Sequence, residues 1–167
     1  MKLTKYTDYA LRVLIYLALG NGRQCSIAEI AESYGVSENH LMKVVQQLAR
    51  EGLVDSTRGR GGGLRLRKSA DDIRIGAVVR LTEPDMDLAE CATCIITGLC
   101  GLTPVFGRAT QAFLQVLDEV TLADVIRSGD GLRAMLRLGL VVKDSKTSKR
   151  GASSGRKPVR GAASRRD

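Results

Sequence analysis

Residues 26–68 decide the fold, and they read SIAEIAESYGVSENHLMKVVQQLAREGLVDSTRGRGGGLRLRK. The segment opens with a capping box. In this motif the Ser26 hydroxyl accepts a hydrogen bond from the backbone amide of Glu29, and the Glu29 side chain accepts one from the backbone amide of Ser26. Apolar residues at helical spacing follow, and Gly35 supplies the positive φ of a tight turn. Ser37 caps a second predicted helix, which Gly52 ends. This pattern predicts a helix-turn-helix, with an ordinary helical hairpin as the alternative.

Two short strand-like runs, residues 53–56 and 64–67, come directly after the second helix. A glycine-rich loop between them carries Arg58 and Arg60. Glycine lets such a loop approach DNA closely, and the arginines supply charge for phosphates or the minor groove. A nucleotide phosphate loop is the alternative, but the glycine spacing fits neither GxGxxG nor a P-loop. The hairpin therefore predicts the wing of a winged helix.

The second helix of such a motif reads the major groove of DNA with its N-terminal residues. Asn39 can pair with adenine edges, and His40 or Lys43 can pair with guanine or phosphate. Because His40 is the only histidine in the chain, a metal site built on it is disfavoured. With the wing, the predicted DNA-binding residues are Ser37, Asn39, His40, Lys43, Arg58 and Arg60.

Helical periodicity continues on both sides of this motif. Residues 7–19 predict a first helix that ends at Gly20. In residues 103–120 apolar side chains recur every three or four positions, which predicts a long amphipathic helix. That helix can pack on its own domain or against a second copy, and a two-fold dimer would set two reading helices ~34 Å apart on a palindrome. Thr121 marks a further helix start.

Charge divides the 167 residues into three parts under a formal net charge of +8. Residues 1–68 carry 11 basic and 6 acidic side chains, and we assign them to the winged helix-turn-helix. Residues 69–142 carry 6 and 10, and we assign them to a cluster-binding loop and dimerisation helices. Residues 143–167 carry 9 and 2 around a single large aliphatic residue, which predicts a disordered basic tail. The tail is either a solvated segment or a sequence-independent contact to DNA phosphates.

Composition also excludes several classes of protein. A basic chain favours nucleic acid or an anionic membrane surface as partner. The longest apolar run, residues 13–19, is far short of the ~20 residues of a membrane span, and no signal cleavage site follows it. We therefore expect a cytoplasmic protein without a membrane partner, whose cysteines stay reduced. No catalytic constellation is present in the sequence, so we do not expect an enzyme.

Three clustered cysteines, Cys91, Cys94 and Cys100, have the spacing C-x2-C-x5-C. Thiolates bind soft metals, but a structural zinc site and an iron–sulfur cluster each want four ligands. No histidine follows Cys91, so the fourth ligand is Cys25, an oxygen donor, a small molecule or a group of another subunit. Cys25 itself favours a buried structural role. Three interpretations remain open: an iron–sulfur cluster, a zinc site or a dithiol redox switch.

The assembled motifs resemble the Rrf2 family of winged-helix regulators from residue 1 to about residue 140. The resemblance is carried by the three cysteines and by residues 1–12, 34–37, 58–63, 75–80 and 121–125. It implies a mainly α protein, with a winged helix-turn-helix, a long C-terminal dimerisation helix and a cysteine-rich cluster loop. It also implies a homodimeric regulator of transcription. A small iron–sulfur electron carrier, the competing class, would have no winged helix.

The resemblance further implies the fourth ligand. One subgroup of the family uses a histidine soon after the third cysteine, and residues 101–104 offer none. The nitric-oxide-sensing subgroup has an aspartate in the first helix that ligates the cluster of the partner subunit, and Asp8 matches that position. Without the resemblance, Asp8 would be an ordinary acidic residue in a first helical turn, where the helix dipole favours negative charge.

The function implied by the resemblance is a repressor that senses nitric oxide. A [4Fe–4S] cluster, or alternatively a [2Fe–2S] cluster, would be held by Cys91, Cys94, Cys100 and the partner subunit's Asp8. Nitrosylation of the cluster would release a palindromic operator in double-stranded DNA. The alternative is an iron- or redox-responsive iron–sulfur regulator of the same family.

Overall fold

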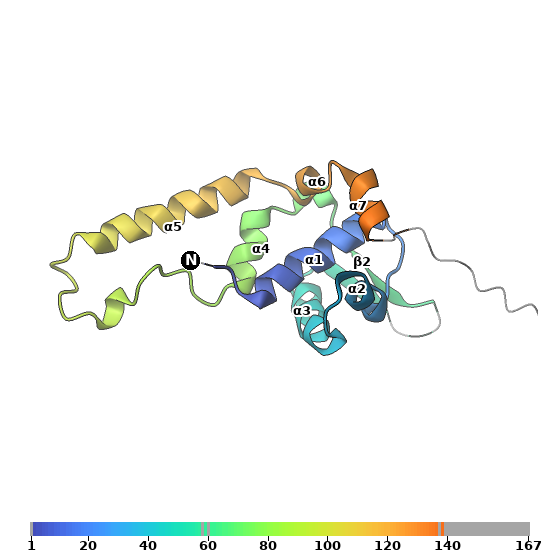
Figure 1. The fold of residues 1–167 in the computed structure, drawn as a ribbon, viewed down its shortest axis with the longest axis horizontal. Coiled ribbons are helices and arrows are strands. Elements are labelled where there is room, and N and C mark those ends of the chain that lie inside the picture. The colour runs from blue at the N-terminus through green and yellow to red at the C-terminus, as the bar shows by residue number, and fades with distance from the viewer. Residues whose placement is uncertain (1, 58, 60, 137, 139–167) are drawn as a thin grey trace, which may run out of the picture.

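The computed structural model describes residues 2–57, 59, 61–136 and 138. Arg58, Arg60 and the predicted tail at residues 143–167 lie outside the described residues. The described part of the chain is mainly helical, as predicted (Figure 1). Its elements in chain order are α1 (Lys5–Leu19), α2 (Ile27–Tyr34), α3 (Glu38–Arg50), β1 (Val54–Thr57), β2 (Gly63–Leu66), η1 (Ala70–Asp72), α4 (Ile75–Thr82), η2 (Cys91–Thr93), α5 (Leu102–Glu119), α6 (Leu122–Val125) and α7 (Gly129–Met135).

The predicted helix-turn-helix is confirmed as α2 and α3. Ser26 accepts a hydrogen bond from the amide of Glu29 at 3.1 Å, and Gly35 ends α2 with a φ of 62°. The Glu29 carboxylate also accepts from the hydroxyl of Tyr16 at 2.9 Å and from Arg23, which ties α2 to α1. Although burial acts to raise it, the pKa of Glu29 is lowered by these hydrogen bonds.

The second helix begins after Ser37, as predicted, but the Ser37 hydroxyl makes no capping hydrogen bond to α3 within the described residues. The inner face of α3 is the predicted one and is buried against α1 and α2: Leu41, Val44, Val45 and Leu48. Its outer face is left to solvent.

The wing is confirmed as an antiparallel pair of strands, with Val54 opposite Leu66 and Thr57 opposite Gly63. Cys25 adds a third segment to this sheet, since its amide and carbonyl pair with those of Leu64 at 2.9 and 2.8 Å. Cys25 is 0% exposed, so its predicted burial is confirmed. Burial raises the pKa of the Cys25 thiol.

One hydrophobic core joins the helix-turn-helix to the segment that follows the wing. Val13, Leu14 and Leu17 of α1 are buried together with Val78 and Val79 of α4. Figure 1 shows α1 running through the middle of this body, with α3 and α4 on different sides of it. The winged helix-turn-helix region, residues 1–68 (the reading head), and the segment that follows it are therefore held to one another through α1.

The long helix α5 confirms the prediction for residues 103–120. It extends away from the core body, with the cysteine loop at its far end (Figure 1). None of its residues is buried within the single chain. At its near end, Ile75 donates to the carbonyl of Val120 at 3.0 Å. The predicted helix start at Thr121 is present as a complete capping box with Asp124.

Two helices, α4 and α7, were not predicted from the sequence. The latter returns to the reading head, where Arg133 donates to the carbonyl of Leu19 at 3.0 Å and Ser33 donates to that of Leu136 at 3.4 Å. Within the described ranges, no helix is both long and apolar enough to span a bilayer.

Candidate nucleic-acid interface and cysteine loop

The four predicted DNA contacts on α3 share one solvent-facing surface. Ser37, Asn39, His40 and Lys43 are all exposed, whereas Leu41 between them is buried. The helix period of 3.6 residues produces this separation, because positions 39, 40 and 43 fall on the face opposite the core. In a helix-turn-helix the exposed face of the second helix is the one that enters the major groove.

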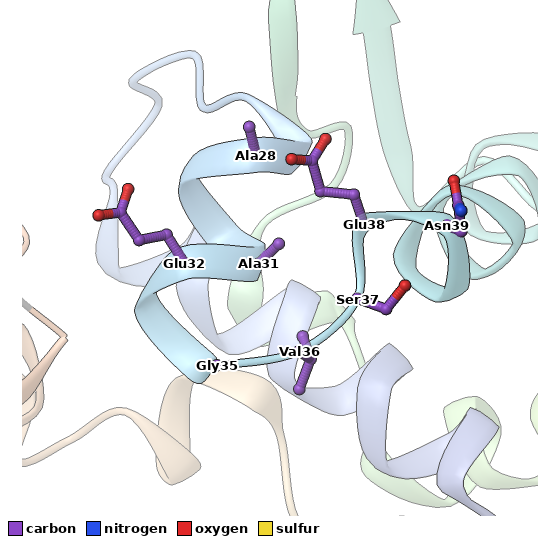
Figure 2. Close-up of a pocket in the computed structure, with 8 residues that line it drawn as sticks. All are labelled: Ala28, Ala31, Glu32, Gly35, Val36, Ser37, Glu38 and Asn39. Carbon is purple, nitrogen blue, oxygen red and sulfur yellow. The ribbon is translucent and has the colours of Figure 1, made fainter.

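A hollow of about 650 Å³ lies beside this surface, between α2 and the start of α3. Figure 2 shows Ala28 and Ala31 of α2 on one side of it and Ser37 and Asn39 on the other. Because alanine side chains are short, this side of α2 leaves the first turn of α3 uncovered. A protruding first turn is the part of a recognition helix that reaches base edges.

Three further residues are exposed on α3 and were not predicted as DNA contacts: Met42, Gln46 and Arg50. The spacing of Met42, Gln46 and Arg50 after Asn39 is three or four residues, and that periodicity was the available signal. The Glu38 carboxylate, which borders the hollow, can accept from a cytosine amino group but repels phosphates. Arg50 adds positive charge near the other end of the helix.

The stem of the wing carries partly neutralised charge. Asp55 on β1 pairs with Arg65 on β2 at 3.3 Å and with Arg67 at 3.9 Å. Both arginines remain more than half exposed. The stem is therefore held by cross-strand ion pairs, which leave guanidinium surface for phosphate contacts. The predicted tip residues Arg58 and Arg60 lie outside the described residues.

The three clustered cysteines lie on one loop at the far end of α5. Cys91 and Cys100 are half-buried and Cys94 is exposed, and all three thiols are free. The loop is a series of turns. In these turns the backbone amide of Cys94 donates to the carbonyl of Cys91 at 3.2 Å, and the backbone amide of Cys100 donates to the carbonyl of Ile96 at 3.1 Å. Within the part of the chain that the structure describes, no three His, Cys, Asp or Glu side chains are grouped to hold a metal ion.

The donor chemistry of this loop fits an iron–sulfur cluster with an external fourth ligand. Three free thiols within ten residues are the soft donors that such a cluster takes. The side chains of Ile95 and Leu99 are 100% and 95% exposed, and those of Ile96 and Leu102 are each 55% exposed. Apolar side chains of this kind commonly form the shell that limits water around a cluster. A hollow of about 390 Å³ lies between Cys91 and Phe106 of α5.

Asp8 is not grouped with the cysteines in the single chain. It lies in the first turn of α1, where its two carboxylate oxygens pair with Arg12 at 2.8 and 3.0 Å. The Arg12 guanidinium also lies over the ring of Tyr34, 5.5 Å from its centroid. The Asp8 side chain is 46% exposed, and a second partner for its carboxylate would compete with Arg12.

Comparison with known proteins places the chain in a family. The family model described as "Rrf2: Iron-dependent Transcriptional regulator" matches residues 3–128. The HTH-type transcriptional regulator NsrR of Bacillus licheniformis is 49% identical over 142 residues, which cover 81% of this chain and 99% of that protein. The NsrR protein of Bacillus subtilis is 46% identical over 144 residues, which cover 83% of this chain and 99% of that protein.

Solved structures show the same architecture. CymR, described as the global cysteine regulator of B. subtilis, matches with a TM-score of 0.65 and 30% identity over 77% of this chain and 98% of its own. IscR of T. potens matches with a TM-score of 0.64 and 27% identity over 80% of this chain and 91% of its own. The chain therefore belongs to the Rrf2 family, and it is a winged-helix regulator of transcription rather than an enzyme.

Proposed function

We propose that the chain is a homodimeric iron–sulfur repressor that leaves its DNA when nitric oxide attacks the cluster. The observation that carries this proposal is the cysteine loop, where three free thiols lie among apolar side chains that a single chain leaves in solvent. The thiols are suited to bind a metal group, and the exposed apolar side chains are suited to contact a partner chain. The similarity to two NsrR proteins supports the same function.

The proposed partner is double-stranded DNA with a palindromic operator. Asn39, His40 and Lys43 occupy the exposed face of α3, next to Ser37 at its start. Hydrogen bonds from such residues to base edges give sequence preference, whereas lysine and arginine contacts to phosphates give affinity that falls with salt. Arg58 and Arg60 of the wing would add contacts of the second kind.

The proposed dimer uses α5. Val105 and Val116 of this helix are 43% and 62% exposed, and the helix buries none of its residues in one chain. Its 18 residues span about 27 Å, at ~1.5 Å of rise per residue. Two such helices packed about a two-fold axis would cover the apolar face and present two reading helices to the two halves of a palindrome.

The proposed ligands are Cys91, Cys94 and Cys100 with the partner subunit's Asp8. The bound group, [4Fe–4S] or alternatively [2Fe–2S], supplies iron that nitric oxide can attack. A carboxylate is a hard donor beside three soft thiolates, so Asp8 is the ligand that is released most easily. In the single chain Arg12 holds that carboxylate, so Arg12 competes with the cluster for it.

The family description speaks of iron dependence, and this observation favours a second candidate function. In that case the same ligands and the same DNA surface serve a regulator that responds to iron supply or to redox state. The two candidates differ in the stimulus alone.

Anaerobic purification followed by titration tests the proposal. We expect a brown protein whose visible absorbance changes with nitric oxide, and whose affinity for its own promoter falls in parallel. Removal of iron by a chelator, without nitric oxide, separates the two stimuli. A colourless protein whose DNA affinity ignores both iron and nitric oxide would contradict both candidates.

The aspartate ligand is tested by Asp8→Ala against Asp130→Ala. Asp130 is a matched control because it too lies in the first turn of a helix and pairs with an arginine, Arg133, at 3.4 Å. We expect Asp8→Ala to alter the absorption spectrum and the nitric-oxide response, and Asp130→Ala to leave both unchanged. Identical behaviour of the two variants would remove Asp8 from the ligand set.

A further inference from the structure

Two tyrosines of α1 lie on either side of Asp8 in sequence, and both contact the reading helix. The hydroxyl of Tyr6 donates to Oε1 of Gln47 at 2.5 Å and to the carbonyl of Lys43 at 3.3 Å. The ring of Tyr9 stacks on that of His40, with centroids 6.2 Å apart and planes 23° from parallel. The neighbours of Asp8 therefore touch two of the predicted DNA contacts directly.

These contacts belong to one helical face. Tyr6 and Tyr9 are three residues apart, so they project on the same side of α1, and Asp8 lies within the same two turns. Internal hydrogen bonds hold the first two turns of α1 together, whereas later residues of the helix, such as Leu14, are buried in the core. A displacement of Asp8 therefore displaces both tyrosines relative to α3.

Gln47 makes the link to α3 specific. While its Oε1 accepts from Tyr6, its Nε2 donates to the carbonyl of Leu81 in α4 at 2.9 Å. The start of α1 is also tied to the end of α4, because the amide and the hydroxyl of Thr4 donate to Oε1 of Glu83 at 2.8 and 3.1 Å. The first turn of α1, the middle of α3 and the end of α4 thus share one hydrogen-bonded junction.

The chemistry of the two tyrosines differs. The Tyr6 hydroxyl acts as a hydrogen-bond donor to α3. Tyr9 acts through its ring, and an aromatic pair of this kind orients both partners without a hydrogen bond. Tyr6 fixes the backbone of α3 at Lys43, while Tyr9 fixes the imidazole of His40.

We propose that Tyr6 and Tyr9 are positioning residues that transmit the binding state of Asp8 to Lys43 and His40. The inference rests on the proposed function for the identity of the signal, since it takes Asp8 as a ligand of the partner's cluster. When the Asp8 carboxylate changes partner, the first two turns of α1 shift, and the two tyrosines carry that shift to the DNA-reading residues.

The test measures the affinity for the operator of the cluster-loaded protein and of the metal-free protein, and takes the ratio of the two. This ratio is compared between the wild type and three variants: Tyr6→Phe, Tyr9→Leu and Tyr9→Phe. Coupling between two sites is typically 5–150-fold. We expect Tyr6→Phe and Tyr9→Leu to bring the ratio at least five-fold closer to one, about the lower bound of that range. Tyr9→Phe keeps the ring, so we expect it to retain the wild-type ratio.

Tyr34→Phe is the matched control. It removes a hydroxyl from another half-buried tyrosine of the reading head and keeps the ring over which Arg12 lies. A purely structural role for Tyr6 or Tyr9 would weaken DNA binding of both forms equally and leave the ratio unchanged, and that result would overturn the proposal. Tyr6→Phe changes one atom, so the folded state is retained for the measurement.

A second readout needs no cluster. His40 is the only histidine of the chain, so its imidazole protons give one set of NMR signals in the metal-free protein. We expect Tyr9→Leu to remove the ring-current shift of these signals and Tyr9→Phe to keep it. If the His40 signals in Tyr9→Leu have the same chemical shifts as in the wild type, the contact on which the proposal depends is overturned. A wild-type affinity ratio of one contradicts the proposed function, whereas equal ratios in wild type and variants contradict only the transmission.

Discussion

Gly76 of α4 approaches Asp118 of α5 so closely that a Cβ at position 76 would lie 2.8 Å from Cγ of Asp118 and 3.0 Å from its backbone nitrogen. The same carboxylate accepts two hydrogen bonds from Arg80, at 2.6 and 2.5 Å. One turn of α4 therefore provides both the space for the α4–α5 crossing and the cation that holds it. Because α5 meets the core body at this crossing, the joint sets the direction in which the cysteine loop points (Figure 1).

Gly76→Ala should destabilise the protein, because the added methyl group meets backbone as well as side chain at the crossing. Overpacking of this kind costs about 1–3 kcal/mol. Urea unfolding followed by circular dichroism measures it. Gly131→Ala in α7 is the control, since nothing lies within 4 Å of a Cβ there. Alanine in place of glycine in an open helical position should stabilise by about 0.5–1 kcal/mol. Equal stability of the two variants would contradict the close approach.

Asp118→Asn should change how stability depends on pH. The hydrogen bonds from Arg80 lower the pKa of the Asp118 carboxyl in the folded state. A lowered folded-state pKa stabilises the fold above the unfolded pKa of an aspartate, ~3.9, and this contribution is lost as pH falls through the lower folded value. The wild type should therefore exceed the variant in stability at pH 6, and the difference should shrink towards pH 3. A difference that stays constant with pH would exclude this ion pair as its source.

Cys25 should be unreactive in the folded protein and dispensable for metal binding. Its thiol is buried and burial raises its pKa, while the thiolate is the reactive form. Mass spectrometry after alkylation of metal-free protein should show Cys94 labelled first and Cys25 labelled only in denaturant. Cys25→Ala should retain its iron and Cys94→Ala should lose it. Loss of iron from Cys25→Ala would instead make Cys25 the fourth ligand.

Asn39→Ala and Lys43→Ala should weaken DNA binding in different ways. Loss of a base contact at Asn39 costs about 1–3 kcal/mol and relaxes the preference at one base pair. Loss of a phosphate contact at Lys43 weakens binding to all sequences and lowers the salt slope by about 1. Arg127→Ala is the control, because this 81% exposed side chain follows α6 and lies outside the reading head. Titration of operator variants at several salt concentrations distinguishes the two effects.

Truncation after Val142 should lower affinity without altering operator choice. The removed residues carry nine basic and two acidic side chains. Contacts from such a segment go to phosphates, so each one lost reduces the salt slope by about 0.9 and affects specific and non-specific DNA equally. An unchanged slope would show that the segment does not contact DNA.

Local signals in the sequence were sufficient for the reading head. The hydroxyl of Ser26, the left-handed Gly35 and the buried stripe that includes Leu41 and Val44 lie within a few residues of the elements they define. The wing was predicted to within one residue at each strand. In contrast, α4 and α7 are as short as α2, and within the described residues neither begins with the side-chain capping hydrogen bond that marks the start of α2. Both are stabilised by contact with α1, which is distant in sequence.

The sequence by itself determined which residues face the core, which face outwards on α3, and that three thiols share one loop, because helical period and ligand spacing are local properties. The tertiary structure alone decided the pairing of Cys25 with Leu64, the crossing at Gly76, and the contacts of Tyr6 and Tyr9 with the reading helix. These join residues about 30 or more positions apart, and their partners are chosen by the packing of whole helices. For the same reason Asp8, which pairs with Arg12 in the single chain, meets the cysteine loop in our proposal only when a second chain is present.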